Sequence, residues 1–163
     1  MTQHDYVRDG ANLPDCMKDG PVIDGVHWNI LGQVYSPTHI SDTAFSWKAI
    51  FPIETFVPPH IHTTQDEYVF IKSGSLDFVL DGLHFAARAG NLVHLPKGIS
   101  HGIFNNSGAN VECLFAVTPT CKLVDLFRKI HNLAHPGKVT DVAKNYDVNF
   151  LLPIRAIDAI TKT

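Results

Sequence analysis

Residues 58–74, PPHIHTTQDEYVFIKSG, contain the pattern that decides the fold of this chain. His60 and His62 stand one residue apart, and Glu67 follows His62 by five positions. Side chains alternate between the two faces of a β-strand, so both imidazoles point to the same side and can reach one point in space. The segment TTQD is long enough to turn the chain, after which Glu67 opens the next strand. We therefore expect a metal-ligand geometry.

A third imidazole comes from residues 90–105, GNLVHLPKGISHGIFN, where His101 opens a strand after a turn. First-row divalent ions accept mixed imidazole and carboxylate ligands. Four metal ligands, His60, His62, Glu67 and His101, would leave about two positions of an octahedron open. Open positions are what metal catalysis requires. The sequence predicts one divalent ion, and the ligands suit iron, manganese, nickel, cobalt, copper or zinc without distinguishing among them.

Short hydrophobic runs around this pattern indicate a β-rich fold. Between residues 42 and 118 these runs are rich in Val, Ile, Phe and Trp, and turns separate them without a helical pattern in between. Such spacing favours an antiparallel sandwich or barrel over a parallel sheet. The seven expected strands are AFSWKAIF (44–51), EYVFIKSG (67–74), SLDFVL (75–80), HFAARAG (84–90), NLVHLP (91–96), HGIFNN (101–106) and VECLFAV (111–117).

The two ends of the chain have a different character. Residues 1–40 are irregular, with turn-like DG pairs, and indicate an arm that holds two short strands. The run CKLVDLFRKIHNL (121–133) has apolar residues at helical spacing and predicts one amphipathic helix, packed on the barrel or on a dimer mate. We expect Pro136-Gly137 to end this helix and Thr140 to cap a second one. The apolar tail NFLLPIRAIDAI is expected to pack back on the barrel or on a neighbouring subunit.

We expect a single domain over residues 1–163, with an N-terminal arm (1–40), a barrel core (41–118) and C-terminal helices with a tail (119–163). A chain of 163 residues with 45% hydrophobic and 18% charged residues can bury a real core. Three cysteines, an odd number with wide spacing, exclude a full disulfide framework and are expected as free thiols. Cys113 lies in an apolar run and is expected as a core residue.

Charge and hydropathy exclude several classes of partner. The net charge of −3 and the pI near 6.3 leave no basic stripe for phosphates, which argues against nucleic acid. No window approaches the roughly 20 apolar residues of a membrane span, so no membrane association is expected. The N-terminus is polar and lacks a secretory signal, which favours a cytoplasmic location.

Two motifs in this order resemble those that define the cupin superfamily. Its first motif is a glycine followed by HxH, a glutamate and a later glycine, and residues 60–74 match it from His60 to Gly74. Glu54 is the one departure, because the leading glycine is often found there; this change affects a turn rather than a ligand. The second motif is matched by Gly90, Pro96, Gly98, His101 and Asn105.

The resemblance implies an all-β fold, the cupin double-stranded β-helix or jelly-roll barrel, with C-terminal helices. From about residue 30 to 150 the chain is also similar to one-domain bacterial cupins related to quercetin 2,3-dioxygenase. That likeness implies a metal-dependent dioxygenase that acts on an enolic, flavonoid or phenolic small molecule. Glu67 is then the catalytic residue that takes the substrate proton, and its roles as ligand and as base both stay open. One-domain cupins are usually dimers, so we expect a homodimer.

Two other functions stay open, because this fold hosts many activities. The first is a redox-neutral enzyme, an isomerase, cyclase or lyase, that uses its metal as a Lewis acid. The second is a non-catalytic protein that binds a small molecule.

Strand parity predicts what faces the ion. If Glu67 and His101 point inward, so do Val69, Ile71, Ile103 and Asn105. Further aromatic candidates for the lining are Phe45, Trp47, Phe56, Phe78 and Phe115. No arginine or lysine is aimed at the ion, which disfavours a small dicarboxylate such as oxalate and favours a flat, partly apolar molecule with a chelating enol or catechol. The remaining histidines are expected at the surface or behind the ligands: His4, His27, His39, His84, His94, His131 and His135.

Overall fold

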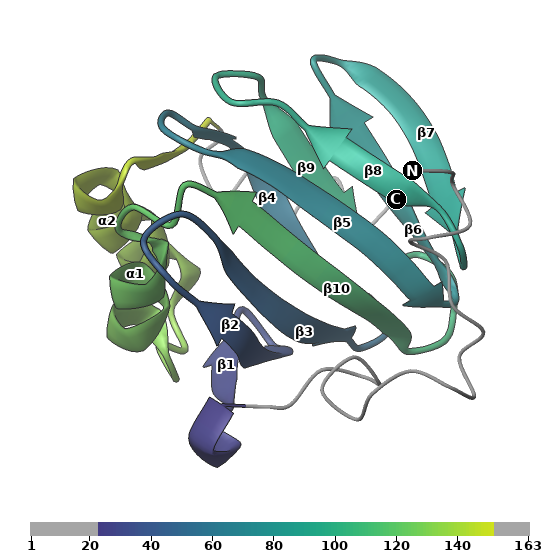
Figure 1. The fold of residues 1–163 in the computed structure, drawn as a ribbon. Coiled ribbons are helices and arrows are strands. Elements are labelled where there is room, and N and C mark those ends of the chain that lie inside the picture. The colour runs from purple at the N-terminus through teal and green to yellow at the C-terminus, as the bar shows by residue number, and fades with distance from the viewer. Residues whose placement is uncertain (1–22, 152–163) are drawn as a thin grey trace, which may run out of the picture.

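Two antiparallel sheets make up most of the structure, which is a computed structural model and describes residues 23–151. One sheet has six strands in the order β1-β2-β3-β10-β5-β8, and the other has five in the order β11-β4-β9-β6-β7. The sheets form the walls of a barrel, and both helices lie together beside one end of it (Figure 1). The predicted jelly-roll barrel with C-terminal helices is confirmed.

The six-stranded sheet contains β1 (Trp28–Ile30), β2 (Gln33–Ile40), β3 (Phe45–Phe51), β10 (Val111–Thr118), β5 (Asp66–Ser73) and β8 (Leu92–Leu95). The five-stranded sheet contains β11 (Val148–Phe150), β4 (Phe56–His62), β9 (His101–Phe104), β6 (Ser75–Leu80) and β7 (Leu83–Arg88). The helical elements are η4 (Ile23–Gly25), α1 (Leu123–Ile130), α2 (Pro136–Ala143) and η5 (Lys144–Tyr146).

All seven predicted strands are present, as are the strand expected at His60 and His62 (β4) and two strands in the arm (β1 and β2). The six-stranded sheet begins at Trp28, inside the range assigned to the arm, because β2 pairs along β3 and carries β1 with it. The start of the predicted apolar tail forms β11, which pairs with β4. The rest of that tail, residues 152–163, and the first part of the arm, residues 1–22, lie outside the described residues.

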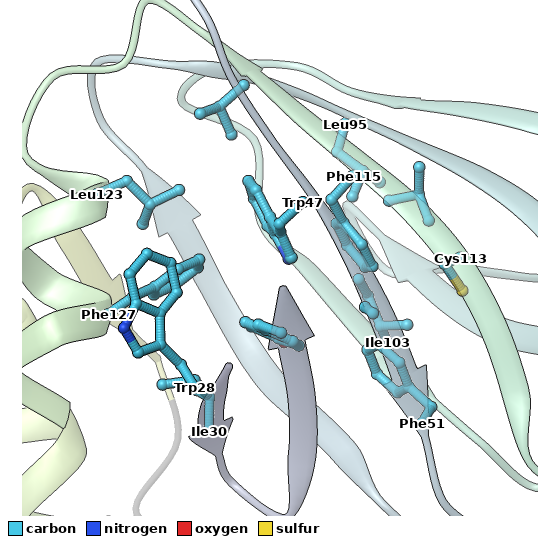
Figure 2. Close-up of a cluster of buried hydrophobic side chains, with 14 of the residues drawn as sticks. Trp28, Ile30, Trp47, Phe51, Leu95, Ile103, Cys113, Phe115, Leu123 and Phe127 are labelled. Atoms are coloured by element: carbon cyan, nitrogen blue, oxygen red, sulfur yellow. The ribbon is translucent and has the colours of Figure 1, made fainter. Parts of the chain in front are cut away.

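Alternation along the strands places a stack of aromatic rings between the two sheets. Trp47 of β3 and Phe115 of β10 are cross-strand partners, and their ring centroids lie 5.2 Å apart in a stacked arrangement. Phe51 stacks on the other side of Phe115 at 6.0 Å. Figure 2 shows these rings beside Ile103, between the two walls of the barrel. Full burial of one such side chain stabilises the fold by roughly 1.5–3 kcal/mol.

Helix α1 packs its apolar stripe against the open end of this core. Every apolar residue of that stripe is buried within the chain: Leu123, Val124, Leu126, Phe127 and Ile130. The Phe127 ring meets Trp28 edge-on at 5.9 Å and Trp47 at 5.1 Å. The stripe therefore packs on the barrel, which was one of its two predicted positions. Among residues 23–151, no helix has the length and apolar character needed to cross a bilayer.

Helix α2 begins earlier than the sequence predicts. It starts at Pro136 rather than after Thr140, and α1 already ends at Ile130, so Pro136 opens a helix and does not end the previous one. Proline suits the first helical position because the N–H that it lacks has no partner there. The ring of His135 accepts a hydrogen bond from the Gly137 N–H at 3.1 Å and caps the helix.

The turn between β3 and β4 is fastened to the end of β9. Glu54 in this turn has a φ of 64°, the left-handed region that favours glycine, so the departure from the family pattern does lie in a turn. Its N–H donates to the Asn105 carbonyl at 3.1 Å. The side-chain amide of Asn105 lies within hydrogen-bond distance of three further carbonyls, those of Phe51, Pro52 and Ala109. Asn105 is buried as predicted, but it fastens the backbone instead of lining a cavity.

The Glu54 turn gives a direct test of backbone strain. Glu54→Gly removes the cost of about 1–2 kcal/mol that a side chain has in the left-handed conformation. Glycine also makes the unfolded chain more flexible, which lowers stability by about 0.5–1 kcal/mol. We expect the free energy of unfolding to rise by roughly 0.5–1 kcal/mol, measured by urea denaturation. Glu54→Ala keeps the strained φ and serves as the control; equal midpoints for the two variants would contradict this account.

Candidate metal centre

The four predicted ligands meet at one buried point. His60 and His62 come from β4, Glu67 from β5 and His101 from β9. The Nε2 atoms of His60 and His62 lie 3.2 Å apart, and Glu67 Oε2 lies 3.2 Å from His62 Nε2 and 3.1 Å from His101 Nε2. All four ligand atoms lie within 4.8 Å of one another, and each of the four residues is 4% exposed or less. This group can therefore hold a metal ion.

Glu67 reaches this point from the opposite wall of the barrel. β4 and β9 are neighbours in the five-stranded sheet, with His60 paired to His101. β5 belongs to the six-stranded sheet, so the turn after His62 carries the chain from one sheet to the other. The sequence predicts a carboxylate from the next strand, and that strand lies across the barrel rather than alongside β4. The site is thus closed between the two sheets.

The second nitrogen of each imidazole is held by an oxygen acceptor. His60 Nδ1 lies 2.8 Å from the Pro58 carbonyl, and His101 Nδ1 lies 3.2 Å from the Ile99 carbonyl. A carbonyl oxygen only accepts, so these Nδ1 atoms carry the hydrogen and leave the Nε2 lone pairs free. Imidazoles that ligate metals are typically held in this way. The donor set and its orientation therefore fit a divalent transition ion.

Gln65 holds the remaining imidazole and is a residue that the sequence analysis missed. Its Oε1 lies 2.9 Å from His62 Nδ1, and the side chain is only 1% exposed. Its Nε2 donates to the carbonyls of Pro119 at 3.0 Å and Thr120 at 2.6 Å. These two acceptors fix the amide so that its oxygen faces His62. The only sequence signal is an amide residue within three positions of His62, in a segment interpreted as a simple turn.

Burial and neighbouring charges shift the pKa values of His60, His62 and Glu67. Burial lowers the pKa of His60, and the neighbouring His101 and His62 lower it further, so the pKa lies well below its usual value. Burial also opposes charge on His62, but the Glu67 carboxylate outweighs it and raises the His62 pKa. Burial would raise the Glu67 pKa, yet His62 and the contact with His101 hold it far below its usual value. The carboxylate therefore stays ionised, as a metal ligand must be.

An apolar cavity of about 50 Å³ adjoins the cluster. Within residues 23–151, no lysine or arginine lines it, in agreement with the sequence analysis. Trp47 and Phe115 line this cavity, whereas Phe45 and Phe78 lie in the surrounding core, and Val69 and Ile71 are buried without lining it. Its other walls come from both sheets and both helices and include Tyr35, Val57, Ile103, Leu123, Phe127, Ile130, Val139, Val148 and Phe150.

Two buried N–H donors in this region have no hydrogen-bond partner among the described residues. The first is Trp47 Nε1, whose side chain lines the cavity. The second is Gln33 Nε2, whose Oε1 accepts a hydrogen bond from the Tyr35 hydroxyl at 2.8 Å. A buried donor without a partner costs about 1–3 kcal/mol. Trp47 lines the cavity and Gln33 does not, so the indole is the candidate donor to a molecule bound there.

The remaining histidines and cysteines lie away from the cluster. His27, His39, His84, His94, His131 and His135 are exposed, as predicted. Cys113 is buried, and burial together with Glu112 raises its pKa to about 12, so it behaves as a core residue. Cys121 is an exposed free thiol, and Cys16 and His4 lie outside the described residues.

Gln65 should affect metal binding without touching the ion. Gln65→Leu removes the acceptor from His62 Nδ1, and we expect the affinity for Co²⁺ to fall roughly 10- to 100-fold, measured by competition with a chromophoric chelator. Gln65→Glu keeps an oxygen atom near His62 Nδ1, so its affinity for Co²⁺ should fall less than that of Gln65→Leu. Equal losses in the two variants would show that the contacts with the 119–120 segment matter rather than the acceptor.

Comparisons with known proteins agree with this fold. Residues 48–117 match the family described as the cupin domain. No curated protein sequence matches the chain.

Three solved structures illustrate the likeness. A sugar phosphate isomerase from a cupin superfamily of Silicibacter pomeroyi is 22% identical over 55% of this chain and 61% of its own, with a TM-score of 0.51. The nucleoside dehydratase Pac13 of Streptomyces is 17% identical over 61% of this chain and 80% of its own, with a TM-score of 0.53. The cupin domain of Schizosaccharomyces pombe Cnp3 is 13% identical over 71% of this chain and 84% of its own, with a TM-score of 0.56. The chain spans under two thirds of the length of the first protein, and these identities show a shared fold only. Residues 48–117 thus match the cupin domain family, and the solved structures share the fold of this chain.

Proposed function

We propose that the protein is a metal-dependent dioxygenase of the quercetinase-like kind, acting on an enolic or phenolic small molecule. One observation carries the proposal: three imidazole nitrogens and one carboxylate converge beside an apolar cavity. A divalent ion held by His60, His62, Glu67 and His101 would supply Lewis acidity that lowers the pKa of a chelating hydroxyl, with about two positions left open.

The side chains around the ion define the roles in this proposal. Glu67 Oε2 lies 3.2 Å from His62 Nε2 and 3.1 Å from His101 Nε2, which supports a role for the carboxylate in taking the proton of a substrate hydroxyl bound at the same point. Their Nδ1 contacts hold His60, His62 and His101, so in this proposal these three are the fixed ligands. Helix α1 covers the cavity with apolar side chains and limits the access of water.

The cavity lining favours a neutral, mostly apolar substrate. Within the part of the chain that the structure describes, no cationic side chain faces the cavity to pair with a second carboxylate. The unpartnered Trp47 N–H would instead donate to a carbonyl or ether oxygen. An enol next to a carbonyl satisfies both requirements, because it chelates the ion and also offers an acceptor.

Oxygen uptake tests the dioxygenase proposal. The protein is loaded in turn with iron, manganese, nickel, cobalt and copper and is incubated with 3-hydroxyflavone and catechol in an oxygen electrode. We expect one O2 consumed per substrate molecule with at least one metal, and none with His101→Ala or with metal-free protein. Turnover that proceeds equally under nitrogen would overturn the proposal.

A redox-neutral enzyme is the second candidate, and the structural neighbours favour it. They include proteins named as a sugar phosphate isomerase and a nucleoside dehydratase. The same carboxylate and the same Lewis acid suffice for moving a proton between neighbouring atoms. Turnover with zinc in the absence of O2 would select this candidate.

The Trp47 N–H gives a test of substrate recognition. Trp47→Phe keeps a buried ring but removes the donor, and we expect the Kd of 3-hydroxyflavone for the Co²⁺-loaded protein to rise roughly 5- to 10-fold, since such a bond is worth about 1 kcal/mol net. Visible absorption under nitrogen measures this Kd. Trp28→Phe is the matched control, because Trp28 is buried but does not line the cavity. Similar shifts in both variants would mean that packing, not the N–H, is responsible.

A further inference from the structure

Two hollows in this end of the barrel share one wall. The inner cavity beside the ligands has a volume of about 50 Å³, and a more open groove outside it has about 450 Å³. The groove lies between the β1-β2 hairpin, the turn from β3 to β4 and the connection from α1 to α2. Among the described residues, Leu31 is the one that lines both hollows, so the groove and the inner cavity meet at this residue.

The two volumes show that neither hollow alone suits an enolic substrate with a ring system. An apolar cavity of about 150 Å³ can hold benzene, and sites for small molecules measure about 300–1,000 Å³. The inner cavity admits only the few atoms of a chelating head. The volume of the groove falls within the range of small-molecule sites, but none of the four metal-ligating residues lines it. A substrate that reaches the ion therefore needs both.

The backbone at Leu31 is unusual for a hairpin. Leu31 and Gly32 connect β1 to β2 with φ values of 52° and 82°, and a two-residue turn of this type favours Asn-Gly. A bulky residue rarely adopts a left-handed conformation, and such residues cluster at functional sites. Leu31 packs against the core and lines both hollows, and a turn-forming Asn would pack less well on that apolar core.

We propose that Leu31 is the gate of a two-part substrate site: the chelating head enters the inner cavity, and an aromatic or other flat apolar body lies in the groove. This inference rests on the proposed function and names the substrate class more closely. The groove offers Phe56 and Leu133 for the body, and the side chains of Asn29, Asn132 and Glu54 for polar substituents. Glu54 disfavours an anionic body, so the substrate is a neutral enol with a ring-sized extension.

The test uses two probes with the same 3-hydroxy-4-pyranone head. Maltol is little more than that head, whereas 3-hydroxyflavone adds a fused ring and a phenyl group. Binding to Co²⁺-loaded protein is measured under nitrogen by visible absorption, and association rates by stopped flow. For the wild type we expect 3-hydroxyflavone to bind at least tenfold more tightly than maltol.

Three variants separate the groove from the metal centre. Ala134 is exposed and lines the groove. Ala134→Trp should therefore raise the Kd of 3-hydroxyflavone at least tenfold and change the Kd of maltol less than twofold. Ala89→Trp is the matched control, because Ala89 is exposed in the turn between β7 and β8, outside both hollows. Leu31→Ala should speed the association of 3-hydroxyflavone severalfold. Leu31→Asn should do the same and suits the turn, so the hairpin stays folded.

Each outcome bears on one of the two proposals. Tight maltol binding with weak 3-hydroxyflavone binding would keep the metal centre and overturn the two-part site. An Ala134→Trp variant that binds both probes as the wild type does, or weakens both equally, would also overturn it. Unchanged association rates in both Leu31 variants would contradict the proposal that Leu31 controls entry to the inner cavity. If neither probe alters the Co²⁺ spectrum, the proposed substrate class falls and this inference falls with it.

Discussion

The burial of three imidazoles and a carboxylate inside an apolar barrel is the constraint on which the rest of the structure depends. A buried polar group without a partner costs several kcal/mol, and an unpaired buried charge costs more. The chain meets this constraint with short contacts: backbone carbonyls accept from two of the imidazoles, and a side-chain amide accepts from the third. The result is a set of ligand atoms already oriented toward one point, with the cost of burial offset before any ion is bound.

Much of the barrel follows from local patterns in the sequence. Alternating apolar residues predict the seven central strands, and the parity of His60 and His62 predicts that both face one point. The motif that ends in Asn105 predicts where His101 joins them. These features depend on the spacing of residues along the chain, which can be read directly from the sequence.

Other features depend on contacts between distant segments, and the sequence analysis did not predict them. The placement of Glu67 on the opposite wall needs the sheet order, because strand parity alone does not tell a neighbouring strand from a facing one. The role of Gln65 needs the carbonyls of Pro119 and Thr120, more than fifty positions away. The small volume of the inner cavity depends on how closely α1 packs, and hydropathy gives only the face that it buries.

The contact between Gln65 and the 119–120 segment has a mechanical consequence. That segment leads from β10 into α1, and α1 forms one wall of the inner cavity. A molecule that pushes α1 outward would pull on the two carbonyls and thereby turn the amide that holds His62. The electron-donating strength of one imidazole would then respond to how full the cavity is. The position of the covering helix α1 and the orientation of the metal ligand His62 would then change together.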